Sequence, residues 1–222
     1  MKIEKQNISN RVLEYLRKQI ILGQYEKGDY LVEAALSKEL GVSRGPIREA
    51  ISKLEAENLV ERHSNGRTVV KRFDIIDIQN LYDSRILLET HALKQVDPEV
   101  LEMNKENLFL FVDEMQKSYE HKQRDIESDL AFHGYLVQLT DNHTLIQLWT
   151  SLKEVFRTLI DITSEVTESK QQEIIDQHVS IVESLAEGDL KQANNMLTEH
   201  LQDACHYCCE GKKLNMGRDE YV

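Results

Sequence analysis

The stretch LSKELGVSRGPIREAI (residues 36–51) predicts two short helices joined by a tight turn. Leu36 and Leu40 lie four residues apart, so they mark one buried face of the first helix. Gly41 supplies the turn, and Ser43 is placed to cap the second helix. This order of elements is typical of a helix-turn-helix, in which the second helix enters the major groove of DNA.

The second of these helices opens with two arginines on one face. Arg44 and Arg48 are four residues apart, and their guanidinium groups suit the paired acceptors of guanine or of a phosphate. Ser43, just before them, is a supporting candidate. We therefore expect Arg44 and Arg48 to carry readout of double-stranded DNA.

The flanking segments complete a winged form of this motif. Helical spacing of apolar residues begins near Ser9, with Ser9 or Asn10 as the expected cap. After the second helix of the motif, an Asn-Gly pair at 65–66 separates two short β-branched runs, which predicts a hairpin. Gly66 and Arg67 would then lie at the tip of the wing, within reach of DNA.

Beyond Phe73 the pattern changes to helices alone. Apolar residues recur at helical spacing in six segments, which we expect to form an antiparallel bundle of six or seven helices: 75–96, 98–121, 124–140, 142–166, 169–187 and 189–210. The sequence thus predicts a mainly α protein with a winged helix-turn-helix domain over residues 1–73 and a helical domain over residues 74–222.

Charge divides at the same place. The whole chain has a net charge of −12, but residues 1–72 hold 14 basic and 10 acidic side chains while the remainder holds 13 and 29. A basic module on an acidic body limits non-specific DNA affinity and leaves one surface attractive to phosphate.

Other features of composition favour a cytoplasmic protein. No apolar run is long enough to span a bilayer, and the first ten residues are polar, unlike a signal peptide. The cysteines, Cys205, Cys208 and Cys209, are odd in number and clustered, which is no disulfide framework. We interpret them as buried or incidental thiols.

The helical half contains one set of residues with metal-binding chemistry. Asp129 and His133 are four apart on one helix, and His178 and His200 fall on two consecutive helices that an antiparallel turn would bring together. Three imidazoles and a carboxylate suit zinc, nickel or manganese, with positions left open for a ligand. By spacing alone, four ordinary polar side chains are the simpler interpretation.

Taken together, these motifs resemble the GntR family of bacterial transcription regulators, in the FadR-type branch with an FCD ligand-binding domain. The residues that carry the resemblance are Leu40 through Ala50, Gly66, Arg85-x3-Glu89, Asp129-x3-His133, Asn142, His178, Gly188-Asp189 and His200-Leu201. Two positions depart from it: Gly45 stands where the family usually has threonine, and Ala34 stands where some members carry a DNA-contacting arginine. Gly45 remains in the expected DNA-contacting set.

The resemblance implies a function for the whole chain. It implies a homodimer that binds a palindromic operator, most simply as a repressor, and a small organic acid effector bound by the metal and by Arg85, with Asn142 lining the pocket. Arg85 has a second reading as an ion pair with Glu89, and Asn142 as a helix cap. Arg157 is a further pocket candidate, with an ion pair as its alternative. We expect a transcription regulator and not an enzyme. Two other functions stay open: a regulator that senses the metal itself, and a metalloenzyme built on the same four residues.

Overall fold

The structure is a computed structural model that describes residues 2–218, and the side chains of residues 8–214. The chain divides into two compact units. One ends at Asp77 and takes in the chain again from Lys212 on, and the other runs from Ile78 to Gly211. Each unit is described by itself.

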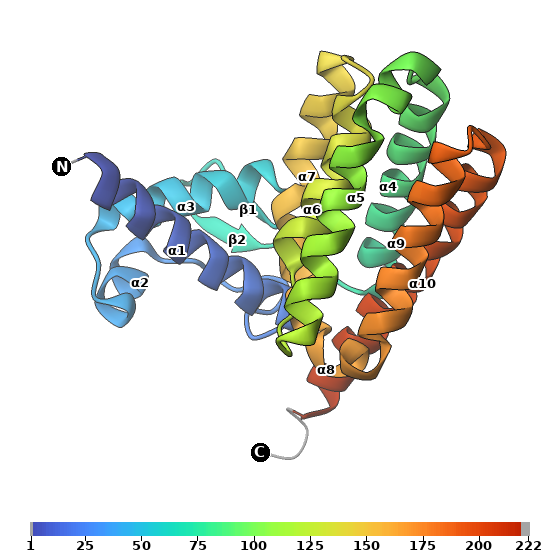
Figure 1. Cartoon of the computed structure of the whole chain (residues 1–222). Coiled ribbons are helices and arrows are strands. Elements are labelled where there is room, and N and C mark those ends of the chain that lie inside the picture. Colours follow the sequence, from blue (N-terminus) through green and yellow to red (C-terminus); the bar gives the residue numbers. More distant parts are fainter. Residues whose placement is uncertain (1, 219–222) are drawn as a thin grey trace. The chain divides into compact units, whose positions relative to one another are not determined.

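The first unit is a winged helix-turn-helix. Its elements are α1 (Lys2–Leu22), α2 (Glu33–Leu40), α3 (Arg44–Ala56), β1 (Val60–Arg62) and β2 (Thr68–Val70). Helix α1 packs along α3, α2 also packs on α3, and the two strands pair antiparallel with Val60 opposite Val70 (Figure 1). Their buried faces form one apolar core that includes Leu16, Ile47 and Leu54.

Turn chemistry fixes the approach to α3. Gly41 ends α2 in the left-handed region at φ 65°, which glycine adopts without the Cβ penalty of other residues. Ser43 holds the extended backbone of an N-cap, but its side chain makes no capping hydrogen bond. Ser43 therefore stands at the expected N-cap position of α3 but does not make the capping hydrogen bond.

The first helix begins earlier than the sequence predicts. Helix α1 starts at Lys2, so Ser9 lies inside it and caps nothing. Its side chain is buried, and its hydroxyl donates to Oε2 of Glu49 on α3 at 2.5 Å. A serine that pairs across the helix interface carries the same sequence signal as a cap, which explains the error.

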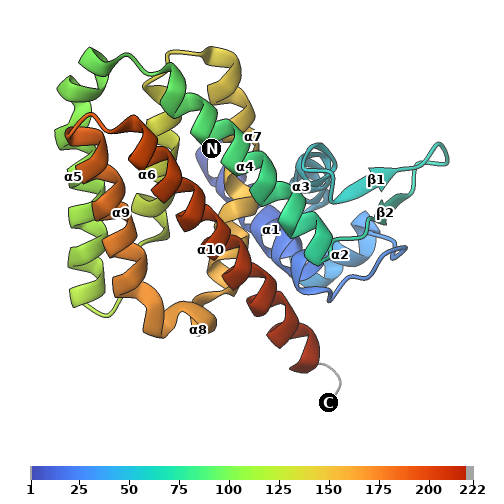
Figure 2. The same ribbon diagram turned by 90° about the vertical axis from the view of Figure 1, so that its right-hand side faces the viewer.

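The second unit is an all-helical antiparallel bundle, as expected. Its helices are α4 (Ile75–Gln95), α5 (Pro98–Glu120), α6 (Ile126–Gln138), α7 (His143–Ile162), α8 (Ser164–Thr167), α9 (Gln171–Ala186) and α10 (Leu190–Arg218), with a 3₁₀ turn at Glu168–Lys170. Helix α5 lies beside α6 and α9, and α9 lies beside α10 (Figure 2). Most of the shared core is aliphatic, and Phe132 sits fully buried in it.

Two boundaries in the bundle differ from expectation. The segment expected as one helix over 142–166 ends at Ile162, because the hydroxyl of Thr163 donates to the Ile160 carbonyl at 2.7 Å and draws it out of the helical ladder. Helix α10 continues to Arg218 instead of ending near 210. Within it, Gly211 lies against Thr163, and a Cβ there would be 3.1 Å from the threonine Cγ2.

Candidate metal centre and DNA-binding face

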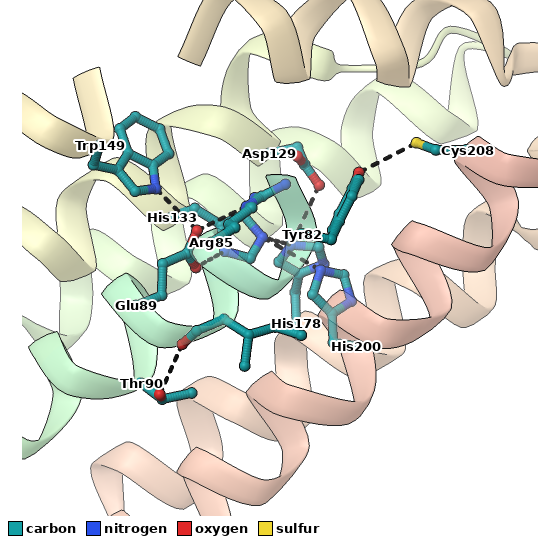
Figure 3. Close-up of polar contacts among 11 residues, drawn as sticks. Tyr82, Arg85, Glu89, Thr90, Asp129, His133, Trp149, His178, His200 and Cys208 are labelled. Atoms are coloured by element: carbon teal, nitrogen blue, oxygen red, sulfur yellow. Dashed lines mark hydrogen bonds and ion pairs between the residues drawn. The ribbon is translucent and has the colours of Figure 1, made fainter. Parts of the chain in front are cut away.

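Four side chains from three helices of the bundle converge on one point. Asp129 and His133 come from α6, His178 from α9 and His200 from α10, and each offers a ligand atom within 4.8 Å of the others (Figure 3). The His133 Nε2 lies 3.3 Å from Nε2 of both other histidines, and His178 Nε2 lies 3.4 Å from Asp129 Oδ1. The set expected from the sequence is therefore brought together in full.

Each histidine is oriented by a second contact at its other ring nitrogen. The Nδ1 atoms of His133, His178 and His200 face Glu89 Oε2 at 2.6 Å, the Ile174 carbonyl at 2.8 Å and Gln177 Oε1 at 2.9 Å. These oxygens only accept hydrogen bonds, so each Nδ1 carries the proton and each Nε2 is left as a lone pair. Three such lone pairs facing one another lack a shared proton, which is the arrangement a bound cation satisfies.

Burial favours the neutral form of two of these imidazoles, those of His178 and His200. It lowers the pKa of His178 to about 4, an effect that Asp129 partly opposes, and it lowers the pKa of His200 well below its usual range. Neutral imidazole is the form that binds metal, and three nitrogens with one carboxylate suit a borderline divalent ion. The residues present therefore fit the metal that the donor set implies.

Glu89 joins the histidines to an arginine. Its carboxylate accepts from Arg85 Nε at 2.7 Å, from His133 Nδ1 at 2.6 Å and from Trp149 Nε1 at 2.9 Å. Burial alone would raise the pKa of Glu89, but the neighbouring His133 and Arg85 outweigh it and lower the pKa to about 2. The carboxylate is thus ionised and fully engaged, and Figure 3 shows the three donors gathered around it.

A glycine allows the indole to reach this carboxylate. Gly134 follows His133 on α6, and a Cβ at that position would lie 2.9 Å from Cζ3 of Trp149. No real side chain tolerates so short a contact, so the ring occupies space that any other residue would fill.

Arg85 lines a small cavity beside the histidines. The cavity holds about 30 Å³ and is also lined by Tyr82, Arg124, Asp129 and His200. The Arg85 side chain is 1% exposed, and its Nη2 is buried without a hydrogen-bond partner in the part of the chain that the structure describes. A buried donor of this kind is costly unless something accepts from it, so the geometry supplies a place for an anionic oxygen.

The other two effector candidates lie in different surroundings. Asn142 is exposed and caps α7, where its Oδ1 accepts from the Leu145 backbone at 3.1 Å, and it does not line the cavity. Arg157 forms ion pairs with Glu127 and Glu154. Both side chains thus take up the alternative roles that the sequence left open.

The cysteines of α10 are thiols and not disulfides. Cys208 and Cys209 are buried, Cys205 is partly buried, and burial raises the pKa of Cys205 and of Cys208 to about 12. The Cys208 Sγ lies 3.2 Å from the Tyr82 hydroxyl at the cavity wall. Thiols with so high a pKa are poor nucleophiles at neutral pH.

The residues expected to contact DNA all lie on the surface of the first unit. Ser43, Arg44, Gly45 and Arg48 are exposed at the start of α3, and Gly66 and Arg67 are exposed in the loop between β1 and β2. Gly66 has φ 80°, and the Asn65 side chain accepts from the Arg67 backbone at 3.0 Å, which closes the turn. This surface is available to a partner.

Two residues on this face were missed by the sequence reasoning. Glu33 accepts from Arg48 at both carboxylate oxygens, and the Tyr30 ring lies 5.4 Å from the guanidinium carbon of Arg67. Glu33 lies in the first turn of α2, where an acidic residue is already explained by its favourable interaction with the helix dipole. The sequence therefore gave no sign of its contact with Arg48. Gln177, which orients His200, was also missed, because a glutamine inside a helix has no distinctive spacing.

Two family models match the chain in succession. Residues 8–70 match "Bacterial regulatory proteins, gntR family", and residues 80–203 match the FCD domain. The first contains the helix-turn-helix and the hairpin, and the second contains all four candidate metal ligands and Arg85.

Relatives extend along both units. The chain is 26% identical over 207 residues to the gluconate operon transcriptional repressor of Bacillus subtilis, which covers 90% of this chain and 85% of that protein. It is likewise 26% identical over 218 residues to the Uxu operon regulator of Haemophilus influenzae, covering 89% and 82%. Both are named as regulators of operons.

Solved structures share the fold. A GntR transcriptional regulator from Rhodococcus matches with a TM-score of 0.64 at 24% identity, over 90% of this chain and 96% of that one. The Escherichia coli protein McbR/YncC matches with a TM-score of 0.65 at 18% identity, over 91% and 97%. The winged helix-turn-helix, the bundle and the two matching models lead to one conclusion: this chain belongs to the GntR family of bacterial regulators, with an FCD domain, and it is a DNA-binding transcription regulator and not an enzyme.

Proposed function

We propose that this regulator is a repressor whose affinity for its operator is set by a small carboxylate bound at the candidate metal centre. The single observation that carries the proposal is the buried Nη2 of Arg85, which has no acceptor among the described residues, together with the position of Arg85 in the same cavity wall as His200 and Asp129. A carboxylate is the ligand whose two oxygens suit both a guanidinium N–H and a metal ion.

The roles of the protein groups follow from their contacts. Asp129, His133, His178 and His200 would hold zinc, nickel or manganese, which when bound supplies positive charge and open positions for a ligand oxygen. Arg85 would donate to a second oxygen of the effector. Asn142 has no contact that supports a role in the pocket, so we leave it out of the effector site.

Cavity size argues for a conformational response. A cavity needs about 10–15 Å³ to hold one water molecule, so one of about 30 Å³ holds only a few atoms. An organic acid of ordinary size binds only when the helices around the cavity move apart. Because ligands favour the state that they bind better, this expansion gives the effector a differential affinity for two arrangements of the protein.

The effector class is a small hydroxylated carboxylate. One relative is named for a gluconate operon, and gluconate is a hydroxy acid. A metal and an arginine beside one cavity suit a carboxylate with a neighbouring hydroxyl. The proposed effector site is supported by this ligand chemistry and by the residues that line the cavity.

On the DNA side we propose a homodimer in the cytoplasm on a palindromic operator. One helix and one wing contact too few base pairs for selectivity, and two-fold symmetry doubles the site. Arg44 and Arg48 would read bases and phosphates, with Ser43, Gly45, Gly66 and Arg67 at the backbone.

A second candidate function is sensing of the metal itself, which the small cavity favours because an ion fits without expansion. The affinity for the metal distinguishes a metal sensor from a regulator that keeps its metal as a cofactor. A cofactor stays bound through purification, whereas a sensor releases its metal at cellular concentrations.

The test combines metal analysis with DNA release. Purified protein is assayed for metal, then for release from a selected operator duplex by a panel of hydroxy acids, beside Arg85→Lys, which keeps the charge that Glu89 needs but lacks the second guanidinium nitrogen. We expect about one metal per chain and a carboxylate response that falls at least tenfold in the variant. If no acid changes operator affinity while added metal does, the sensor function replaces this proposal.

A further inference from the structure

Arg48, the exposed arginine near the start of α3, is held by a carboxylate from the neighbouring helix. Its Nε donates to Glu33 Oε1 at 3.1 Å and its Nη2 to Glu33 Oε2 at 2.9 Å, a parallel two-bond fork between α3 and α2. The two side chains remain 62% and 32% exposed. The contact therefore orients the guanidinium without removing it from the surface.

Glu33 stands among several positive charges on this face. Its pKa is lowered, mainly by the hydrogen bond from Arg48; burial opposes this, and the charges of Arg48, Arg62 and Arg44 add to the lowering. The same face carries the residues that would approach phosphate. An acidic side chain there opposes binding to any DNA sequence, since sequence-independent affinity grows with the number of positive charges that meet phosphates.

The fork has a geometric consequence for Arg48. A guanidinium is planar and has five N–H donors, of which Glu33 engages one on Nε and one on Nη2. Of the remaining donors, one on Nη2 and one on Nη1 point in parallel from the adjacent end of the guanidinium, and that edge keeps the pairing geometry that suits the N7 and O6 acceptors of guanine. An arginine without such a partner samples many rotamers and reaches the nearest phosphate as readily as a base.

We propose that Glu33 is a positioning residue that makes Arg48 a reader of base sequence, at the expense of general affinity for DNA. The inference rests on the proposed role of Arg48 in DNA contact. It adds an acidic determinant of specificity to a surface otherwise described by its basic residues. The pair contributes little to folding because both groups are exposed, so its removal leaves a folded protein to test.

The experiment measures base preference and general affinity separately. The full-length protein and three variants are bound to a library of randomised DNA duplexes, and base preference is read at each position of the bound fraction. Affinity for a fixed duplex that lacks the selected site is measured over a range of salt concentrations. The variants are Glu33→Gln, Arg48→Ala, and Glu39→Gln as a charge-matched control on an exposed side chain near the other end of α2.

The expected result has two parts. Glu33→Gln should lower the preference about tenfold at the same base positions that Arg48→Ala flattens, and it should raise affinity for the fixed duplex with a steeper salt dependence. Glu39→Gln should leave base preference unchanged.

Three outcomes would overturn the inference. The first is full wild-type preference in Glu33→Gln at the positions that Arg48→Ala loses, which would leave the assignment of Arg48 intact. The second is an equal loss of preference in Glu39→Gln, which would make the effect one of net charge. The third is unchanged preference in Arg48→Ala, which would remove the role of Arg48 and with it the basis for Glu33.

Discussion

Two arginine–glutamate pairs in this molecule have the same chemistry and opposite surroundings. Arg85 and Glu89 lie on one helix of the bundle with side chains 1% and 0% exposed, and their contact is 2.7 Å. Arg48 and Glu33 join two helices of the DNA-binding unit with side chains 62% and 32% exposed, and their contact is 2.9 Å. The distances are nearly equal, so distance says nothing about how the pairs differ.

Surroundings decide what each pair does. In the bundle, water cannot replace a lost partner, so Glu89 is bound to Arg85, His133 and Trp149 at once and none of them is free to exchange. On the DNA-binding face, water and phosphate both compete for Arg48, and the pair is worth about 1 kcal/mol or less. The buried pair fixes the geometry of its site. The exposed pair influences which group Arg48 binds next.

The largest expected effect is on metal content. Changing His178 and His200 together to alanine should abolish binding of the metal, because two of four ligands are lost from a buried cluster. Elemental analysis after reconstitution measures this. The matched control is the double alanine variant of His121 and His206, which are exposed, and equal metal loss in that control would refute the site.

Glu89→Gln should be the most damaging single change to folding. It leaves the buried guanidinium of Arg85 without a counter-charge, which costs about 3–5 kcal/mol in the free energy of unfolding. Metal affinity should fall about 10- to 100-fold, since His133 loses its charged acceptor. Denaturant unfolding and metal titration measure the two effects. Glu33→Gln is the control on the exposed pair, and a similar loss of stability there would break the comparison.

Acid should weaken the metal-free protein. Its folded state keeps His178 neutral down to a pKa of about 4, whereas the unfolded chain protonates that histidine near 6.5. The unfolded state therefore binds more protons between these values, and stability falls as pH drops from 6.5 towards 4, by about 3 kcal/mol from this group. Unfolding of metal-stripped protein across that range tests it, and His178→Ala should flatten the dependence. A stability that rises on acidification would contradict the burial described for this group.

Arg48→Ala should change folding least. We expect a shift in the free energy of unfolding within about 0.5 kcal/mol, because the lost contacts are exposed. Selective operator binding should nevertheless be abolished, as measured by competition against non-specific duplex. Unchanged operator affinity would remove Arg48 from the readout.

The architecture was predicted well from the sequence because most of it depends on the local periodicity of apolar residues. Gly41 and the Asn65-Gly66 pair have few conformational alternatives, and the apolar spacing beyond Phe73 predicted the bundle. Two helix boundaries were predicted wrongly near a residue whose hydroxyl could form more than one hydrogen bond. Ser9 looks like a cap until its partner Glu49 on another helix is known, and Thr163 looks like a neutral helix residue until its hydrogen bond to the Ile160 carbonyl of its own helix is known.

The candidate metal centre was predictable in its ligands and not in its supports. Asp129 and His133 carry their spacing on one helix, but the acceptors of the histidine Nδ1 atoms come from separate elements and include a main-chain carbonyl. A backbone oxygen leaves no trace in residue identity. The unpaired Nη2 of Arg85 is likewise a property of packing and not of spacing.

Gly134 ties this chemistry to the volume of a single methyl group. With any side chain at 134, the Trp149 ring would have to retreat, and its Nε1 would leave the carboxylate that orients His133. The basicity of a metal ligand would then change although no ligand, charge or hydrogen-bonding group had been substituted. In this protein, the absence of one Cβ would thus tune the ion affinity of the candidate metal centre, although the glycine is not itself one of the candidate ligands.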